Sequence, residues 1–287
     1  MHPHDKHDHD LGLAHDLEQL LRQRRRALGW LAGAGALGLL GCGGGDSANA
    51  SSSASSSGGS GGGTTTTPST GTCSVIPEET AGPYPGDGSN SSVGGVANAL
   101  MLSGILRSDI RTSIAGASGT AGGVPLTITL RLVNTNSSCA DLSGYAIYLW
   151  HCDREGRYSM YSTGVTAENY LRGVQVTGSS GTVTFTTVFP GCYDGRMPHM
   201  HFEVYRSSTA ATSYSNKLKT SQIAFPSDVC STVYSSASGY SASVSNFARI
   251  SFASDNVFSD GYSSQLATLT GSVAAGYAAT LTVGISV

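Results

Sequence analysis

The sequence predicts an all-β fold, an antiparallel β-sandwich with long functional loops and little helix. Runs of β-branched and aromatic residues follow one another, bounded by clusters of Gly, Pro, Asn or Ser. No window of helical period reaches a substantial length after residue 72. The 287 residues include 38 glycines and only 12% are charged, as in many exported β-proteins. Several short strands separated by turns build sandwiches or barrels.

The strand signals continue to the end of the chain. They lie at 126–133, 145–150, 181–188, 199–205, 221–225, 248–252, 266–273 and 279–287. Two long irregular stretches, 77–98 and 152–172, remain, and loops of that length are usually functional or disordered. The net charge of −3 comes without a basic patch, so nucleic acid is excluded as a partner.

The first 41 residues predict an export signal. The adjacent arginines Arg25 and Arg26 precede the apolar run 27–40, which is too short to span a bilayer and fits a signal-peptide core. The arginine pair resembles a twin-arginine signal. LLGC resembles a bacterial lipobox, which would make Cys42 the lipidated first residue; a plain cleaved signal or an uncleaved anchor remains the alternative.

Residues 43–72, rich in Gly, Ser and Thr, predict a flexible linker, which leaves 73–287 as one domain. The expected protein is therefore a periplasmic or cell-surface lipoprotein that meets the membrane only through its lipid. The tract MHPHDKHDHD has a metal-binding composition, but it would be removed with the signal.

A possible metal site is indicated by His199 and His201. Alternate side chains of a strand share a face, so these two imidazoles can reach one ion. Polar residues on a wet sheet face are the alternative. Tyr158 and Tyr193 add phenol oxygens nearby. A phenolate is a hard anionic ligand that suits Fe³⁺, and only a strongly polarising ion would keep two phenols with an ordinary pKa near 10 ionised at neutral pH.

Four ordered motifs resemble the intradiol ring-cleavage dioxygenases. WHCDREGRYS (150–159) is followed by NYLRGVQVTGSSGTVTFTTVFPGCYDGRMPHMHFEV (169–204), which holds the R-G, P-G-x-Y and R-x-x-H-x-H patterns of that family. PEETAGPYPGDGS (77–89) resembles the stretch that these enzymes place at the active-site mouth. The resemblance spans 77–225 in motifs and 73–287 in strand pattern.

The resemblance implies a ferric ion as cofactor and assigns its ligands. They are Tyr158, Tyr193, His199 and His201, with Tyr161 as the alternative to Tyr158. In the family the second tyrosine leaves the iron when substrate arrives and accepts a proton, a role that falls on Tyr193. Arg196 falls on the arginine that faces the substrate.

Four further residues have roles that the sequence alone leaves open. Arg172 and Gln175 are expected to shape the substrate pocket, with strand pairing as the alternative, and Tyr84 is expected to line its mouth, with loop packing as the alternative. His151 is expected to pack beside Trp150 and make a structural hydrogen bond rather than bind iron.

The implied reaction is O₂-dependent cleavage of a catechol ring between its two hydroxylated carbons to a muconate-type diacid. A tethered, non-catalytic ligand-binding sandwich and a zinc site are the alternatives. Only five residues separate Tyr193 from His199, and the helical dimerisation segment of catechol dioxygenases has no counterpart. These two departures leave the substrate and the oligomeric state open.

Five cysteines follow Cys42, and an oxidising compartment favours their pairing. We expect the bridges Cys152–Cys192 and Cys139–Cys230, with Cys73 left unpaired.

Overall fold

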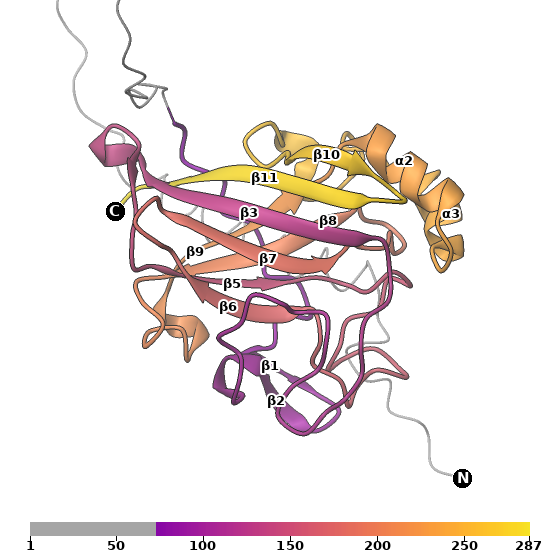
Figure 1. The fold of residues 1–287 in the computed structure, drawn as a ribbon, viewed down its shortest axis with the longest axis horizontal. Coiled ribbons are helices and arrows are strands. Elements are labelled where there is room, and N and C mark those ends of the chain that lie inside the picture. The colour runs from indigo at the N-terminus through magenta and orange to yellow at the C-terminus, as the bar shows by residue number, and fades with distance from the viewer. Residues whose placement is uncertain (1–72) are drawn as a thin grey trace, which may run out of the picture.

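Two packed β-sheets form the body of the protein. A computed structural model describes residues 73–287. The five-stranded sheet runs in the order β10-β11-β3-β4, with β7 also paired to β3 (Figure 1). Its strands are β3 (Pro125–Asn134), β4 (Ala140–Asp141), β7 (Thr182–Val188), β10 (Thr268–Ser272) and β11 (Gly276–Ile285). The pairing is antiparallel except between β11 and β3.

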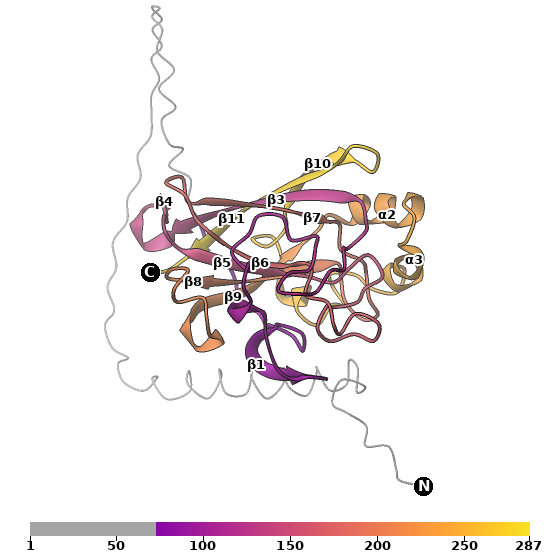
Figure 2. The same cartoon turned by 60° about the horizontal axis from the view of Figure 1, so that its bottom comes forward.

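The four-stranded sheet runs in the order β6-β5-β8-β9 and is antiparallel. Its strands are β5 (Ala146–Trp150), β6 (Arg172–Val176), β8 (His199–Tyr205) and β9 (Lys217–Ala224). Figure 2 shows the two sheets as layers, with the hairpin of β1 (Asp87–Ser92) and β2 (Gly95–Asn98) beyond the four-stranded one. The predicted sandwich is confirmed.

The central strands of the four-stranded sheet are buried on both faces. Every residue of β5 and β8 is buried. One face, with Leu149 and Phe202, packs against the five-stranded sheet in the main core. The opposite face carries Tyr148 and Trp150 in a second core under the long loops, together with His199 and His201. The face toward the main core is apolar, with Met200, Phe202 and Val204, whereas the opposite face buries the polar side chains of His199, His201 and Glu203.

The strand predictions hold with one exception. The segment 248–252 is not a strand but follows a helical corner, and β6 and the β1–β2 hairpin were not predicted.

The helices are short: η2 (Ala99–Met101), η3 (Thr135–Ser137), η4 (Tyr214–Asn216), α2 (Ser227–Ser236), α3 (Ser241–Phe247) and η5 (Phe258–Asp260). α2 packs on the core through Cys230, Val233 and Tyr234. Within residues 73–287 none of the helices is long and apolar enough to cross a membrane.

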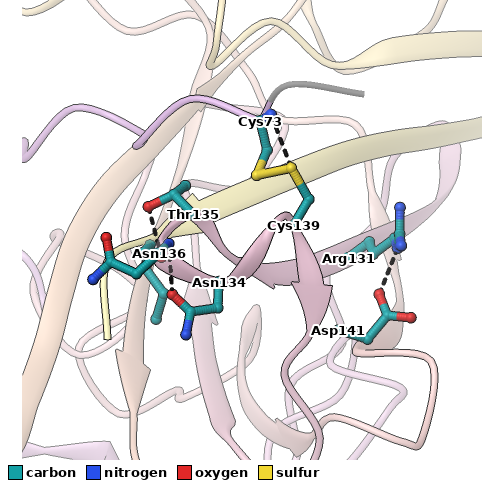
Figure 3. The surroundings of a disulfide bond; sticks show 8 residues. Cys73, Arg131, Asn134, Thr135, Asn136, Cys139 and Asp141 are labelled. Atoms are coloured by element: carbon teal, nitrogen blue, oxygen red, sulfur yellow. Dashed lines mark hydrogen bonds and ion pairs between the residues drawn. A yellow bond between two sulfur atoms is a disulfide. The ribbon is translucent and has the colours of Figure 1, made fainter. Parts of the chain in front are cut away.

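The predicted disulfides are wrong. Cys73 bonds to Cys139 across a Cα–Cα distance of 5.7 Å (Figure 3). The first described residues run beside β11, where the Ile76 N–H donates to the Gly284 carbonyl, and this brings Cys73 to the turn that follows η3. Sequence spacing carries no sign of that approach.

The other three cysteines of the described domain, Cys152, Cys192 and Cys230, are free and buried. The Cys152 thiol lies 3.5 Å from the Gly191 carbonyl, and burial raises the pKa of this thiol well above its usual value. The pKa of Cys230 is raised well above its usual value by the same cause. Protonated thiols packed in apolar surroundings are structural rather than reactive.

Candidate metal centre

Two imidazoles meet at the start of β8, a central strand of the four-stranded sheet. His199 and His201 lie two positions apart on β8, and their Nε2 atoms are 3.0 Å from each other. Both side chains are 2% exposed. The Nδ1 atom of His199 is 2.6 Å from the Met197 carbonyl and donates to it, which leaves the Nε2 lone pair free to bind a metal. Trp150 on β5 stacks on His201 with ring centroids 5.0 Å apart and an interplanar angle of 6°.

Two phenols from separate loops complete the group. The hydroxyl of Tyr193 is 3.2 Å from the His199 Nε2, and that of Tyr158 is 3.5 Å from the same atom. Tyr158 belongs to the long loop before β6, and Tyr193 belongs to the loop between β7 and β8. The four predicted ligands are thus gathered around one point.

A tight turn brings the two loops together. The carboxylate of Asp153 accepts hydrogen bonds from the backbone N–H groups of Glu155 and Arg157, which bends the chain just before Tyr158. Gly156 in this turn has φ +83°, and a Cβ there would lie 3.1 Å from the Cβ of Tyr193. Glycine at 156 therefore allows the left-handed turn and the close approach of the second phenol loop.

The donor atoms fit a small, hard cation. Atoms bound at roughly 2 Å to one ion lie about 3 Å or slightly more from each other, as the donor atoms do around His199. Within residues 73–287 no group of three His, Cys, Asp or Glu side chains could hold a metal ion. Any ion here therefore depends on the phenols. A set of two phenol oxygens and two imidazoles suits Fe³⁺ through its hard anionic oxygens.

Burial keeps the imidazoles neutral. The pKa of His199 is lowered well below its usual value, first by burial and then by the charge of Arg196. Burial and His199 itself do the same to the pKa of His201. Burial, followed by the neighbouring Tyr193, raises the pKa of Tyr158 well above its usual value. The neutral imidazoles are ready to bind a metal, whereas Tyr158 needs a strongly polarising cation to ionise.

A buried cation lies beside the ligands. The Nε of Arg196 is 3.0 Å from Asp255, and its Nη2 donates to the side-chain oxygen of Gln222 at 2.7 Å. Burial alone would lower the pKa of Arg196, but Tyr193 and Asp255 outweigh it and raise that pKa. Arg196 therefore carries a permanent positive charge next to the phenols.

Asp255 and Gln222 are site residues that the sequence reasoning missed. Gln222 lies directly opposite His201 on β9, so the two side chains share a face. The strand around Gln222 was predicted, but which strand pairs with β8 was not. Asp255 lies in the loop before η5, and no sequence pattern indicated that it would reach the site.

A short segment, residues 80–86, covers the ligands and is here called the roof. The ring of Tyr84 packs on Tyr158 with centroids 4.9 Å apart. A Cβ at Gly82 would lie 3.4 Å from the His201 ring, and Gln222 donates to the Thr80 carbonyl at 2.9 Å. The structure thus places Tyr84 next to a predicted ligand.

Three residues named from the sequence lie outside the group. Tyr161 donates to Asn90 at 2.6 Å and accepts from the Gly86 N–H at 2.8 Å, so its hydroxyl supports the roof and Tyr158 is the tyrosine beside the histidines. The side-chain nitrogen of Gln175 donates to the Thr184 carbonyl, so the structure does not bring Gln175 to the ligands. Both nitrogens of His151 are engaged, by the Cys152 carbonyl and the Thr187 hydroxyl.

One carboxylate near His201 also lies outside the group. Glu203 follows His201 at the two-residue spacing of a histidine–carboxylate ligand pair, but its oxygens accept from Tyr205 at 2.7 Å and Lys217 at 3.0 Å.

Comparisons with known proteins agree with this fold. The family model described as Dioxygenase matches residues 107–238. An intradiol ring-cleavage dioxygenase from Tetranychus urticae is 25% identical, with a TM-score of 0.55 over 75% of this chain and 95% of that one. A second dioxygenase structure is 26% identical, with a TM-score of 0.54 over the same shares. No protein of curated function matches the sequence.

The fold and the four converging donors define a β-sandwich with a candidate phenol–imidazole metal centre. The chain is similar to the intradiol ring-cleavage dioxygenases, through the family match over residues 107–238 and through a shared fold over 75% of its length. Members of this family typically use Fe(III).

Proposed function

We propose that the protein is a ferric intradiol dioxygenase that cleaves a catechol-type ring between its two hydroxylated carbons with O₂, giving a muconate-type diacid. The observation that carries the proposal is the convergence of Tyr158, Tyr193 and His201 on the Nε2 of His199, at 3.5, 3.2 and 3.0 Å. A bound ferric ion would supply the Lewis acidity that activates the catechol toward O₂.

The side chains divide the remaining work. Tyr193 is partly exposed whereas Tyr158 is 1% exposed, which favours Tyr193 as the phenol that gives way to substrate. Once free, its phenolate oxygen accepts a catechol hydroxyl proton, which converts the substrate to its anionic form. Tyr158, His199 and His201 stay in place as fixed ligands.

Arg196 is the group suited to stabilise the negative charge of the substrate. It is held on one side by Asp255 and on another by Gln222, so its guanidinium is oriented before substrate arrives. A preorganised cation in a buried site stabilises developing charge without reorganising.

A non-catalytic binding module and a zinc enzyme are the competing functions. A binding module would not require two phenols and two neutral imidazoles to share one point. Zinc sites are built from Cys, His, Asp and Glu rather than from phenol pairs. Both competitors would be colourless, whereas phenolate bound to Fe³⁺ absorbs strongly in the visible range.

The test is iron loading followed by oxygen uptake with a panel of catechols and identification of the product. The proposal predicts a coloured protein, uptake with at least one catechol, and a diacid that contains both atoms of O₂. A protein that stays colourless after iron loading and takes up no oxygen with any catechol would favour the binding module.

We further propose that the domain is exported and tethered through a lipid at Cys42. The signal-like residues 1–41, Cys42 and the linker 43–72 all lie outside the described residues. The proposal is supported by the paired arginines, the LLGC sequence and the disulfide Cys73–Cys139, which fits an oxidising compartment. Mass spectrometry of the membrane fraction tests it through the acyl mass on Cys42.

A further inference from the structure

Arg172, the first residue of β6, is a buried cation next to the metal centre that the proposed chemistry does not use. Its side chain is 1% exposed. An arginine has five N–H donors, and all five are engaged here. They reach the Ser159 hydroxyl (3.1 Å) and carbonyl (2.9 Å), the Tyr84 carbonyl (2.9 Å), the Pro85 carbonyl (2.7 Å) and the Tyr148 hydroxyl (3.1 Å).

These partners come from two segments that touch the ligands. Ser159 follows the ligand Tyr158 directly, so two of the five bonds fix the backbone and side chain next to that phenol. Tyr84 and Pro85 belong to the roof, and the Tyr84 ring packs on Tyr158. Arg172 therefore joins the ligand loop to the segment that covers it.

The chain makes room for this guanidinium at a specific position. A Cβ on Gly86 would lie 2.7 Å from the Nη1 of Arg172, and Gly86 has φ +61°. The Arg172 guanidinium also lies over the Tyr161 ring, 5.4 Å from its centroid, and Tyr161 accepts the Gly86 N–H. The packing of Arg172 against Gly86, its cation–π contact with Tyr161 and the hydrogen bonds to Pro85 and Gly86 all hold the C-terminal end of the roof.

The bonded partners of Arg172 are neutral carbonyls and hydroxyls. Burying a charge with neutral partners costs more than burying an apolar side chain such as methionine. Packing alone therefore gives little reason for an arginine here. The planar guanidinium of an arginine, with its five N–H donors, is suited to holding several backbone carbonyls in place at once.

We propose that Arg172 is a positioning residue that fixes the Tyr158 loop and the roof, residues 80–86, relative to one another, and so sets the ligand geometry and the cover of the ferric site. The inference rests on the proposed function for its iron-dependent part. Its first consequence is independent of iron: in the metal-free protein, roof and ligand loop should loosen together when Arg172 is replaced.

The test compares Arg172→Met, Arg172→Lys and Gly86→Ala with the control Arg107→Met. Arg107 also donates to backbone carbonyls, those of Arg172, Thr112 and Asn169, but it bonds neither to the roof nor to Ser159. Arg172→Met removes all five donors and Arg172→Lys keeps some. Gly86→Ala displaces the guanidinium and leaves its charge, which keeps the test valid if Arg172→Met does not fold.

Hydrogen exchange of the metal-free variants is the first readout. We expect peptides covering 80–86 and 157–162 to exchange about 10-fold faster or more in Arg172→Met and Gly86→Ala, less so in Arg172→Lys, and as in the wild type in Arg107→Met. The proposal is overturned if Arg172→Met and Gly86→Ala leave both peptides unchanged, or if Arg107→Met loosens them equally.

Ferric titration is the second readout. We expect Arg172→Met to bind Fe³⁺ about 10- to 100-fold more weakly, as loss of a residue that orients a metal ligand typically does. We also expect its visible band to be displaced. An unaltered band and affinity in Arg172→Met would overturn the iron-dependent part. A wild-type protein without any band would instead overturn the proposed function, while the exchange result would still decide the link between roof and ligand loop.

Discussion

Trp150 lies flat on the ring of His201, with the ring centroids 5.0 Å apart and the planes within 6° of parallel. The two residues face each other across the β5–β8 pair, so the register of the sheet itself sets this contact. The aromatic plane and the close approach of Gly82 in the roof restrict the imidazole to an orientation in which its Nε2 lies 3.0 Å from the Nε2 of His199.

Trp150→Leu should therefore loosen His201 as well as the core. We expect the variant to lose about 3 kcal/mol of unfolding free energy from the space it opens and to bind Fe³⁺ about 10-fold more weakly. Trp150→Phe keeps a flat ring on the imidazole and should lose less of both. Denaturant unfolding and ferric titration measure the two effects, and equal iron affinity in Leu, Phe and wild type would contradict the orienting role.

Replacing Tyr193 should mainly lower turnover, whereas replacing Tyr158 should mainly weaken iron binding. Tyr193→Phe removes the proposed proton acceptor, so we expect turnover to fall at least about 100-fold while some visible colour remains from Tyr158. Tyr158→Phe removes the buried fixed ligand and should weaken iron binding most. Tyr161→Phe is the matched control, because its hydroxyl bonds to Asn90 and Gly86 and should leave the band in place. A Tyr161→Phe variant that lost the band would reverse the ligand assignment.

His151 should make the fold sensitive to acid. Burial lowers the pKa of His151 from 6.5 to about 4. The hydrogen bond to the Cys152 carbonyl raises this pKa, and the charge of Arg172 lowers it. A folded-state pKa below the unfolded one contributes stability that is complete above pH 6.5 and is lost as the pH falls toward 4. The free energy of unfolding falls by up to about 3 kcal/mol over this pH range. Urea unfolding at pH 7 and pH 4 should show a smaller decrease for His151→Gln than for the wild type, and identical decreases would contradict this cause.

The disulfide should tie down the start of the domain. Cys73 and Cys139 are 66 residues apart in sequence, and a bridge across a loop of that size typically contributes about 2–4 kcal/mol. Cys73→Ser should lower the free energy of unfolding by that amount and make it insensitive to a reducing agent, whereas reduction should lower that of the wild type. Replacement of the free Cys230 by Ala is the control that should keep the response to reductant.

The convergence of the four candidate ligands could be predicted from sequence because each lies in a local pattern. Strand alternation places His199 and His201 on one face, and Tyr158 and Tyr193 lie in short motifs whose order resembles a family. What the sequence did not provide is which segments meet. Gln222 reaches Arg196 only because β9 pairs with β8, and Asp255 arrives from a loop some sixty residues further along the chain than Arg196.

The same lack of long-range information explains the errors. Cys73 pairs with Cys139 because the first described residues run along β11, a parallel neighbour of β3 that no local signal reveals. Gln175 lies on β6, and its side chain reaches the carbonyl of Thr184 and not the candidate ligands. The segment 248–252 has strand-like composition and lies instead after α3, where apolar residues pack in a small core beside Phe258.

The measurement closest to the central claim is a ferric titration of the wild-type protein followed in visible light. Two phenolates and two imidazoles on one ion predict an intense red-brown band that grows to one equivalent of Fe³⁺, then stops, and that weakens in Tyr158→Phe and Tyr193→Phe. A wild-type protein that stays colourless, or that binds iron with the same band after both tyrosines are replaced, would contradict it.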